Sequence, residues 1–245
     1  MDTEMPLILG HRGVRGPIEN TLPAFRRAVR YADGVEFDVR ITGDGKLVTH
    51  HDGGFYSGGS FYRIRSLTFA EMKRLHPLGK AIPQVGDVLR LNAALFNADV
   101  KECDAVEPLL KVVEKCGVER VVFSSERPEV VGKILKTCPG CRVGFSIVGY
   151  SSLVWVPRLK GIYSLHVPID AISYVGYGTF RSLLQAFRRR GIKLYLWNYE
   201  MDELFWIPRL LHLVDAVISD DPARLRKSFY PKGLSTGGDG DGMGT

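Results

Sequence analysis

Short apolar segments alternate with amphipathic segments along almost the whole chain. The apolar segments have the length and the β-branched content of buried strands, whereas the segments between them repeat apolar residues at helical spacing. The predicted strands are Leu7–Arg12, Gly34–Thr42, Ala94–Lys101, Arg120–Glu126, Arg142–Val148, Tyr163–Ile169, Lys193–Tyr199 and Ala216–Asp220. The predicted helices are Glu19–Tyr31, Leu67–Leu75, Val85–Leu91, Ala105–Cys116, Glu129–Thr137, Phe180–Arg190, Asp202–Leu213 and Pro222–Phe229, with a further short segment at Ser152–Leu159.

This alternation predicts an α/β fold in which helices cover a parallel sheet. Barrels of this kind commonly run to ~200–250 residues as one domain. Repeated strand-then-helix units in a chain of 245 residues therefore predict a single (β/α)₈ TIM barrel, with only a short insertion after the second strand. An open, doubly wound sheet is the alternative. We expect the barrel to occupy residues 1–230 and the Gly-rich residues 231–245 to form a flexible tail.

The charge balance gives a weak indication of partners. The chain carries 33 Lys and Arg against 27 Asp and Glu, a net charge of +6 that mildly favours anionic partners. Its densest basic run, Arg188–Arg190, ends a predicted helix, where the helix dipole favours cations, so we expect no nucleic-acid partner.

Neither a secretory signal nor an apolar run of the ~20 residues that a membrane span needs is visible in the sequence. We therefore expect a cytoplasmic location and no integral membrane segment. The oligomeric state stays open.

The cysteines allow two interpretations. The C-P-G-C run at 138–141 has the spacing of zinc or redox sites, and equally that of a Pro-Gly turn between a helix and a strand. We favour the turn. Cys103 follows a predicted strand and falls at the opposite end of the barrel from the other three cysteines, which argues against a four-cysteine zinc site. A disulfide from Cys116 to Cys138 or Cys141 remains an alternative.

Polar residues close the predicted strands at the end where (β/α)₈ barrels carry their active sites. The first strand ends in His11-Arg12-Gly13. An Arg presents a planar fork of donors that matches phosphate oxygens, and a His can move a proton near neutral pH. A capped strand end is the alternative explanation for this motif alone.

Two carboxylates share one face of the second predicted strand. Glu36 and Asp38 stand at i and i+2, and alternate residues of a strand point the same way. Parallel barrel strands are buried on both faces, and two like charges there need a cation. Because hard oxygen ligands suit Mg²⁺ or Ca²⁺, we favour a metal site over a strand with a solvent-facing polar side.

The third predicted strand places Asp99 and Lys101 on one face by the same spacing. Asp99 is a candidate third metal ligand, and Lys101 is a candidate contact for a phosphate oxygen. An ordinary ion pair between them is the alternative.

Two adjacent histidines follow a turn signal. Asp44-Gly45 predicts that the next segment, Lys46–Asp52, pairs with the second strand, and His50 and His51 stand near its end. Neighbouring strand residues point to opposite faces, so one histidine faces the site if the other faces away. The parity favours His51 for catalysis, with His50 outward.

Two further strand ends carry candidates. An inward Trp197 could wall a pocket for a small polyol, although plain core packing is the alternative. Asp220 or Asp221 is expected to cap the last helix, with Pro222 in its first turn.

Taken together, these motifs resemble the signature of the glycerophosphodiester phosphodiesterases. The resemblance is densest from Leu7 to Asp52 and continues to Pro222. It is carried by His11-Arg12-Gly13, Pro17-Ile18-Glu19-Asn20-Thr21, Phe25 with Ala28, Glu36-Phe37-Asp38-Val39, Thr42-Gly43-Asp44-Gly45, His51-Asp52, Ser66-Leu67-Thr68, Ile82-Pro83, Ser124-Ser125, Trp197 and Ser219-Asp220-Asp221-Pro222.

This resemblance implies a (β/α)₈ barrel with one divalent cation, for which Mg²⁺ is our first choice and Ca²⁺ or Mn²⁺ the alternatives. It also implies residue roles: metal ligands Glu36, Asp38 and Asp99; an acid/base pair His11 and His51; phosphate contacts Arg12 and Lys101; and a supporting carboxylate Glu19. The family usually has Glu where this chain has Asp99, and often Thr-x-Asn where it has Asn198-Tyr199-Glu200.

The implied activity is metal-dependent hydrolysis of a small glycerophosphodiester to glycerol phosphate and an alcohol, by histidine acid/base catalysis. Which histidine is the acid, and whether a substrate hydroxyl attacks first to give a cyclic phosphate, stays open. One alternative is a related barrel phosphodiesterase that acts on lysophospholipids or sphingolipids, with its chain held by aromatic residues of two loops: Phe55, Tyr56, Phe61, Tyr62, Tyr174 and Tyr177. Another is a barrel that binds a phosphodiester without cleaving it.

Overall fold

The computed structural model describes residues 5–229 and confirms the predicted (β/α)₈ barrel. Eight parallel strands form the barrel: β1 (Leu7–Gly10), β2 (Gly34–Ile41), β6 (Leu95–Val100), β7 (Val121–Ser125), β8 (Arg142–Ser146), β9 (Ser164–Pro168), β10 (Lys193–Trp197) and β11 (Ala216–Ser219). β1 pairs with β11 on one side and with β2 on the other, which closes the sheet and excludes the open alternative. The predicted tail, residues 231–245, lies outside the described residues.

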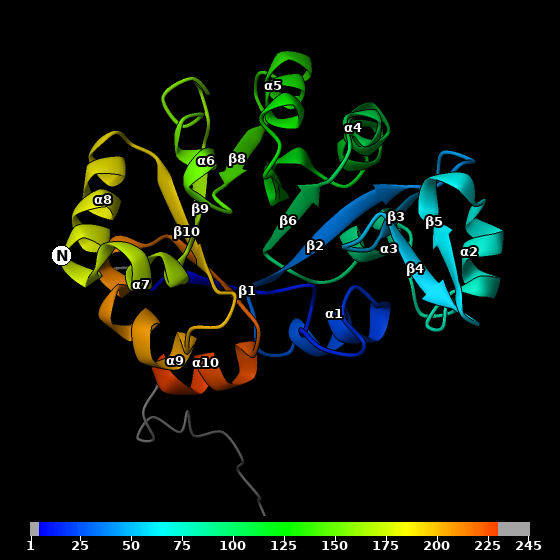
Figure 1. The fold of residues 1–245 in the computed structure, drawn as a ribbon, viewed down its shortest axis with the longest axis horizontal. Coiled ribbons are helices and arrows are strands. Elements are labelled where there is room, and N and C mark those ends of the chain that lie inside the picture. Colours follow the sequence, from blue (N-terminus) through cyan, green and yellow to red (C-terminus); the bar gives the residue numbers. More distant parts are fainter. Residues whose placement is uncertain (1–4, 230–245) are drawn as a thin grey trace, which may run out of the picture.

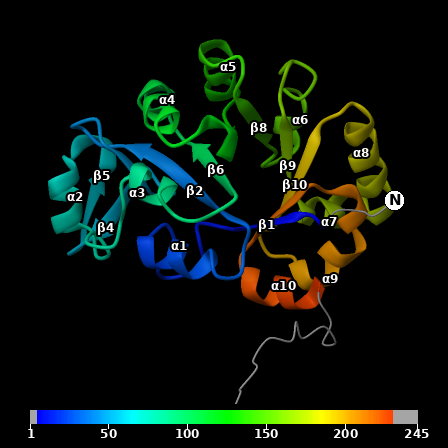
Figure 2. The same cartoon turned by 180° about the vertical axis from the view of Figure 1, so that it is seen from behind.

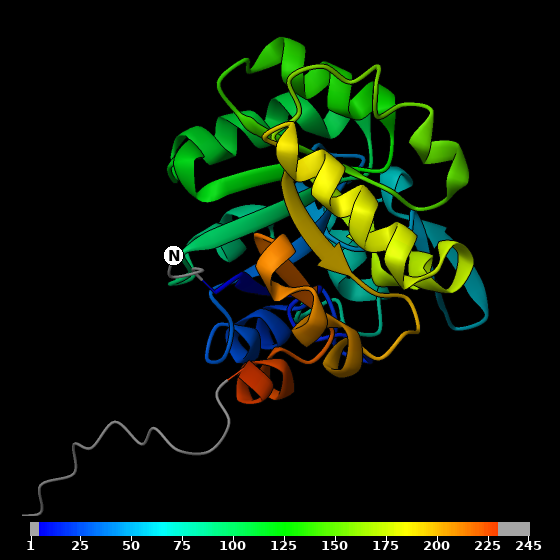
Figure 3. The same ribbon diagram turned by 90° about the vertical axis from the view of Figure 1, so that its left-hand side faces the viewer.

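The helices surround the strands, as Figures 1 and 2 show from opposite sides. They are α1 (Leu22–Ala28), α2 (Phe69–Leu75), α3 (Val85–Leu89), α4 (Val106–Glu114), α5 (Pro128–Thr137), α6 (Tyr150–Leu153), α7 (Ile172–Val175), α8 (Tyr177–Arg189), α9 (Glu203–Trp206) and α10 (Pro222–Phe229). The long helix α8 lies across the outside of β10 (Figure 3).

Two of the predicted helices differ from the observed ones in a way that matters below. α1 begins only at Leu22, because Thr21 caps it, and Glu19 therefore lies in the preceding loop rather than in the helix. The helix predicted at Asp202–Leu213 is confirmed only in its first turn. α9 ends at Trp206 and two 3₁₀ turns follow, because Pro208 lacks the N–H that would continue an α-helix.

The insertion after β2 contains more structure than the sequence predicted. β3 (Leu47–Thr49) pairs antiparallel with β2, as expected, but ends before His50. A separate hairpin of β4 (Gly54–Ser57) and β5 (Ser60–Arg63) follows and lies beside α2 at one side of the barrel (Figure 1). Its residues Phe55 and Tyr62 pack with Met72 in a small core of their own.

Strand alternation divides the buried side chains between two environments. On β2, Val35, Phe37 and Val39 pack outward against the helices, whereas Glu36 and Asp38 point into the barrel. A smaller apolar cluster that includes Leu9, Val122 and Tyr195 fills the barrel interior. The polar inward residues lie beyond it, toward the carboxyl ends of the strands.

The cysteines correct one prediction. Cys138 forms a disulfide with Cys141, so the 138–141 run is a closed turn between α5 and β8, and the alternative pairings with Cys116 are wrong. Cys103 and Cys116 are free thiols.

None of the helices within residues 5–229 is both long enough and apolar enough to cross a lipid bilayer.

Candidate active site

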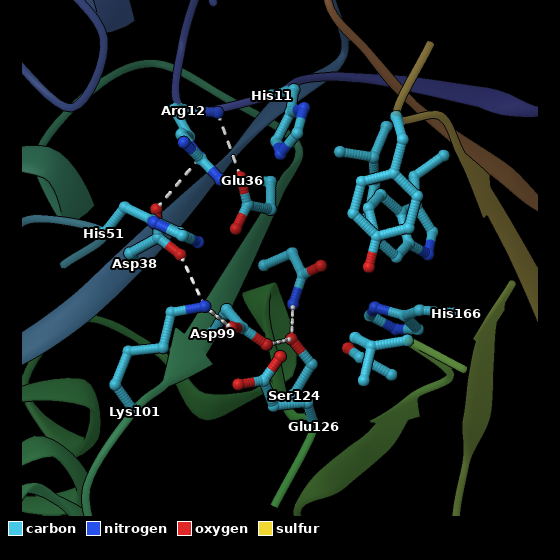
Figure 4. Close-up of a pocket in the computed structure, with 16 residues that line it drawn as sticks. His11, Arg12, Glu36, Asp38, His51, Asp99, Lys101, Ser124, Glu126 and His166 are labelled. Atoms are coloured by element: carbon cyan, nitrogen blue, oxygen red, sulfur yellow. Dashed lines mark hydrogen bonds and ion pairs between the residues drawn. The ribbon is translucent and has the colours of Figure 1, made fainter. Parts of the chain in front are cut away.

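A polar pocket of about 100 Å³ opens at the carboxyl ends of the barrel strands. Side chains from nearly every barrel strand, and from the segment after β3, point into it (Figure 4). The lining residues are His11, Arg12, Glu36, Asp38, His51, Asn97, Asp99, Lys101, Ser124, Glu126, Ser146, Val148, His166, Trp197, Tyr199 and Ile218. All predicted site residues except Glu19 line this pocket, and Glu19 contacts it through Arg12.

The end of β1 places a histidine against a carboxylate from the end of β11. His11 is buried, and its Nδ1 lies 2.6 Å from Oδ1 of Asp220. The carboxylate can only accept, so this contact puts the ring proton on Nδ1 and leaves Nε2 for another partner. Burial alone would raise the pKa of Asp220, but the contact with His11 and the nearby Arg15 lower it below its ordinary value.

Arg12 is held by three carboxylates. Its backbone adopts a left-handed conformation (φ 51°), and its N–H donates to Oε2 of Glu36. Its guanidinium Nη1 donates to Glu19 at 2.5 Å, while Nε lies 3.2 Å from Asp38, close enough for an ion pair but without hydrogen-bond geometry. The left-handed turn thus presents both the backbone and the side chain of Arg12 to the carboxylates.

Lys101 bridges the neighbouring strand ends of β2 and β6. Its Nζ lies 2.8 Å from Asp38 and 2.5 Å from Asp99. Asp99 also accepts a hydrogen bond from Ser124 at 2.8 Å, and Asn97 donates to the same hydroxyl at 2.9 Å. A second amide, from Asn20, donates to Asp38 at 2.8 Å. These contacts fix the rotamers of both carboxylates.

Burial and neighbouring charges shift the pKa values of Glu36 and Asp38, the two carboxylates of β2, in opposite directions. Burial is the largest effect on Glu36 and raises its pKa well above the ordinary value, reinforced by the charges of Asp38 and Asp99. Asp38 is buried to the same degree, yet Lys101 and Arg12 outweigh burial and hold its pKa well below the ordinary range. Glu36 makes no ion pair with any side chain of residues 5–229.

The adjacent histidines after β3 point to different places. His51 lines the pocket, and its Nδ1 lies 2.9 Å from Asp52. His50 is absent from the lining and packs instead against His76, with ring centroids 5.3 Å apart, and against Phe55. His51 is thus placed where it can reach a molecule in the pocket, and His50 is not.

The opposite wall of the pocket carries few charges. Trp197 lies edge-on to His11, and its buried Nε1 has no acceptor among the residues that the structure describes. His166 is stacked on Tyr195, and burial lowers its pKa to about 4, so its ring is neutral at neutral pH. The unpaired indole donor is available to a polar group of a ligand.

The sequence did not predict several residues that line the pocket or contact its lining. Asp220 was considered only as a helix cap, but Asp221 takes that role and Asp220 turns to His11. Asn97 and Ser124 were missed as positioning groups, although Asn97 shares the inward parity of Asp99 and Ser124 lies in the neighbouring strand β7, directly opposite Asp99. His166 was missed as well, although an isolated His on a predicted buried strand could have indicated a pocket residue.

The arrangement and charge of the carboxylates in the pocket bear on whether it can hold a cation. No three His, Cys, Asp or Glu side chains of residues 5–229 meet in a ready metal-binding arrangement, because Lys101 lies between Asp38 and Asp99. Even so, three buried carboxylates face two cationic side chains, and within residues 5–229 Glu36 forms no ion pair with a side chain. Such an excess of buried negative charge fits a hard cation with oxygen ligands.

A charged pocket at the carboxyl ends of eight parallel strands is the arrangement of a (β/α)₈-barrel enzyme. The model of the glycerophosphoryl diester phosphodiesterase family matches residues 11–224, from the first pocket residue into the last helix. The chain belongs to this family of phosphodiesterases.

Individual relatives are consistent with this assignment. A glycerophosphodiester phosphodiesterase of Caldanaerobacter subterraneus subsp. tengcongensis is 29% identical over 245 aligned residues, covering 89% of this chain and 96% of the relative. The crystal structure of a glycerophosphodiester phosphodiesterase from Thermotoga maritima is similar, with a TM-score of 0.75 at 28% identity, over 91% of this chain and 97% of that one. The fold is also that of a phosphodiesterase from Oleispira antarctica, solved with its product sn-glycerol-3-phosphate (TM-score 0.74, 20% identity, 92% and 97% covered).

Proposed function

We propose that this protein hydrolyses glycerophosphodiesters to glycerol phosphate and an alcohol, with His11 and His51 as the acid/base pair and with a divalent cation bound. The observation that carries the proposal is the convergence of both histidines, Arg12, Lys101 and three buried carboxylates on one pocket. The relatives named for this activity support the choice of substrate.

Arg12 and Lys101 are the groups we assign to the phosphate. Both are cations whose charge faces the pocket, and both are partly neutralised by carboxylates. A phosphodiester anion that enters the pocket gains from both charges, and the gain grows as negative charge develops on the phosphoryl oxygens in the transition state. Glu19 and Asp38 keep the guanidinium of Arg12 oriented during this step.

His11 and His51 are the groups we assign to proton transfer. His11 has its Nδ1 engaged by Asp220, which leaves Nε2 to exchange a proton with the substrate. His51 comes from a different segment and lines the same pocket. One takes a proton from the attacking hydroxyl and the other gives a proton to the leaving alcohol; the order, and the use of a cyclic phosphate, remain alternatives.

Glu36, Asp38 and Asp99 are the residues that would hold a cation, with Mg²⁺ as first choice. When bound, a divalent ion supplies Lewis-acid stabilisation of a phosphoryl oxygen. Glu36 contributes a carboxylate that has no other positive partner within the described residues, and Lys101 shares Asp38 and Asp99 in the absence of the ion.

The proposal is tested by a panel of glycerophosphodiesters assayed with Mg²⁺, Ca²⁺ or Mn²⁺ and after chelation. We expect release of glycerol phosphate from at least one member, and loss of that activity on chelation with recovery on adding metal. Full activity after thorough chelation would refute the metal, and inactivity toward the whole panel under all metal conditions would refute the substrate class.

A further inference from the structure

A buried carboxylate lies outside the pocket and has no part in the chemistry proposed above. Glu203 is the first residue of α9, is only 7% exposed and does not line the pocket. Among residues 5–229 no cationic side chain pairs with it, and the nearby Arg15 pairs with Asp220 instead. A buried charge without a counter-charge is costly unless hydrogen-bond donors surround it, so the donors around Glu203 indicate its role.

The side chain of Glu203 turns away from its own helix toward the end of β11. The N-terminus of α9 is capped by Asp202, which accepts a backbone N–H of that helix at 2.9 Å. Glu203 instead accepts from the hydroxyl of Ser219 at 2.6 Å and from the backbone N–H groups of Asp220 and Asp221 at 3.2 and 3.4 Å. One carboxylate thus holds three consecutive residues at the junction of β11 and α10, and α9 packs beside α10 (Figure 1).

The middle residue of this junction orients a catalytic histidine. Asp220 presents Oδ1 to His11 at 2.6 Å, and its Oδ2 accepts from Arg15 at 3.0 Å. The backbone of His11 is fixed as well, because its N–H donates to the carbonyl of Ser219 at 2.8 Å. The contact between the two side chains therefore depends on where the backbone of Asp220 lies, and Glu203 is the side chain that binds that backbone N–H.

Burial makes the hydrogen bonds of Glu203 difficult to replace. It raises the pKa of Glu203 above the ordinary value, although the bonds from Ser219 and from the backbone act in the opposite direction. Ser219 is fully buried, so loss of the carboxylate would leave its hydroxyl and the N–H of Asp220 without an acceptor. The junction would then shift, and a displacement of about 1 Å at a catalytic group can lower the rate by the order of 10²-fold.

We propose that Glu203 is a positioning residue that acts on His11 through Asp220. The inference rests on the function proposed above, in which His11 exchanges a proton with the substrate. Glu203 fixes the backbone of Asp220, whose carboxylate keeps the proton of the neutral His11 ring on Nδ1 and leaves Nε2 for the substrate. The alternative is a purely structural role, in which loss of Glu203 would lower stability and leave His11 unchanged.

The test variant is Glu203→Leu, which removes the acceptor, and Glu203→Gln is its conservative partner. The amide oxygen of Gln can still accept the N–H of Asp220, while its NH₂ donates to the hydroxyl of Ser219. Nitrogen NMR of the histidine rings reports which nitrogen carries the proton, and His11→Gln assigns the signal. We expect the neutral His11 ring to carry its proton on Nδ1 in the wild type and in Glu203→Gln, and to be a mixture of tautomers in Glu203→Leu.

Steady-state kinetics give the second readout. The kcat of Glu203→Leu should fall roughly tenfold with little change in KM, and Glu203→Gln should keep most of the wild-type kcat. The double variant of Glu203→Leu with Asp220→Asn should lose no more than Asp220→Asn alone, because both changes act on one contact. Losses that multiply in the double variant overturn the proposal.

Ser219→Ala is the matched control, since it removes one hydrogen bond of Glu203 and leaves the bond from Asp220. It should lower the melting temperature and keep both kcat and the His11 tautomer. If Glu203→Leu does not fold, Glu203→Asp carries the test, because it withdraws the carboxylate by one methylene and should show the same changes at smaller size.

A wild-type His11 tautomer in the folded Glu203→Leu or Glu203→Asp variant assigns Glu203 a structural role and overturns the proposal. Inactivity of the wild type on every glycerophosphodiester is a failure of the proposed function itself. The tautomer measurement needs no substrate, so it still decides whether Glu203 positions His11.

Discussion

The two halves of the barrel mouth differ in what their strands present. β1, β2, β6 and the residues directly after β1 and β6 contribute side chains that are charged or able to become so: His11, Arg12, Glu36, Asp38, Asp99 and Lys101. β8, β9 and β10 contribute Ser146, His166 and Trp197, and on this side a second, apolar cavity shares Val148 and Tyr199 with the pocket. The backbone geometry is the same in both halves, so the strand order of the barrel alone does not decide which half carries the chemistry.

The difference shows in how each half treats a buried ionisable group. In the charged half, Lys101 and Arg12 lower the pKa of Asp38 against the effect of burial. In the other half, burial lowers the pKa of His166 to about 4, and the charge of Asp99, which acts in the opposite direction, does not offset it. In the charged half, ion pairs stabilise the ionised form of Asp38. In the apolar half, burial keeps His166 neutral. Each prediction below tests one side of this contrast.

The largest effect is expected from His51→Ala. General acid–base groups contribute about 10²–10⁴ in rate, so kcat should fall by that factor while the fold is kept. His50→Ala is the matched control, since His50 is the next residue but packs against His76 outside the pocket. Steady-state kinetics of both variants would decide the assignment; a larger loss for His50→Ala would mean that the neighbours were assigned the wrong way round.

Glu36→Gln should lower activity and metal affinity without lowering the thermal stability of the metal-free protein. The carboxamide keeps the size and can still accept the N–H of Arg12, but it removes a buried charge whose pKa is already raised. We expect activity and metal affinity to fall by roughly ten- to hundredfold or more, and the metal-free variant to melt no lower than the wild type. Calorimetric metal titration and thermal melts with and without Mg²⁺ measure both. A variant that binds metal as the wild type does would remove Glu36 from the site.

Asp38→Asn is the companion test, and its effect on stability should differ from that of Glu36→Gln. Asp38 is paired with Arg12 and Lys101, so its loss leaves two buried cations undercompensated. We therefore expect both lower activity and a lower melting temperature, with partial rescue of activity by excess metal. Equal melting temperatures for the Glu36 and Asp38 variants would contradict the opposite pKa shifts of the two carboxylates.

Asp220→Asn should act through His11. The amide keeps a contact to Nδ1 but no longer fixes which ring nitrogen carries the proton. We expect kcat to drop by roughly ten- to hundredfold, the range for groups that orient a catalytic or metal-bound histidine, with little change in KM. Asp221→Asn, one residue along, changes only the helix cap and should be close to wild type, because Asn caps helices as well as Asp does. A rise in KM with kcat preserved would contradict a positioning role.

Asp99 is the third carboxylate that we assign to the cation, and a smaller effect is expected there. Asp99→Asn removes a charge near the proposed cation and keeps the hydrogen bond from Ser124, so activity should need more metal than in the wild type. Asp99→Glu should be tolerated better. Ser124→Ala, which keeps the charge and removes the hydrogen bond, should shift the metal titration less than Asp99→Asn. Superimposable titrations for Asp99→Asn and wild type would move the third ligand elsewhere.

The sequence predicted the barrel well because eight alternating units leave few other folds, and it predicted the charged half because Glu36, Asp38, Asp99 and Lys101 follow strand parity. It failed where side chains from distant segments meet. Asp220 stands 209 residues after His11, and only closure of the barrel by β1 and β11 brings them together. The second, apolar cavity was predicted only in part: the sequence offered Tyr174 of its lining, in a segment expected to be a loop and observed as α7.

The smallest effect is expected in the apolar half, and on stability rather than on turnover. His166 is buried, its Nε2 lies 3.1 Å from Ser164, and its pKa is lowered to about 4 from an ordinary 6.5. Between these two values the unfolded chain binds a proton that the folded chain does not. The contribution of His166 to the free energy of unfolding therefore decreases as the pH falls through this window.

His166→Gln removes this contribution, because the amide does not titrate and can still bond Ser164. We expect the melting temperature of the variant to fall less than that of the wild type between pH 7 and about pH 4.5, whatever the variant does to stability at pH 7. Other groups, Asp220 among them, also lose stabilising contacts on acidification, so the comparison is between slopes and not between absolute values. His212→Gln, at an exposed histidine, is the control and should keep the wild-type slope. If His166→Gln and His212→Gln follow the same slope, His166 takes up a proton in the folded state, and the apolar half of the mouth can hold a charge after all.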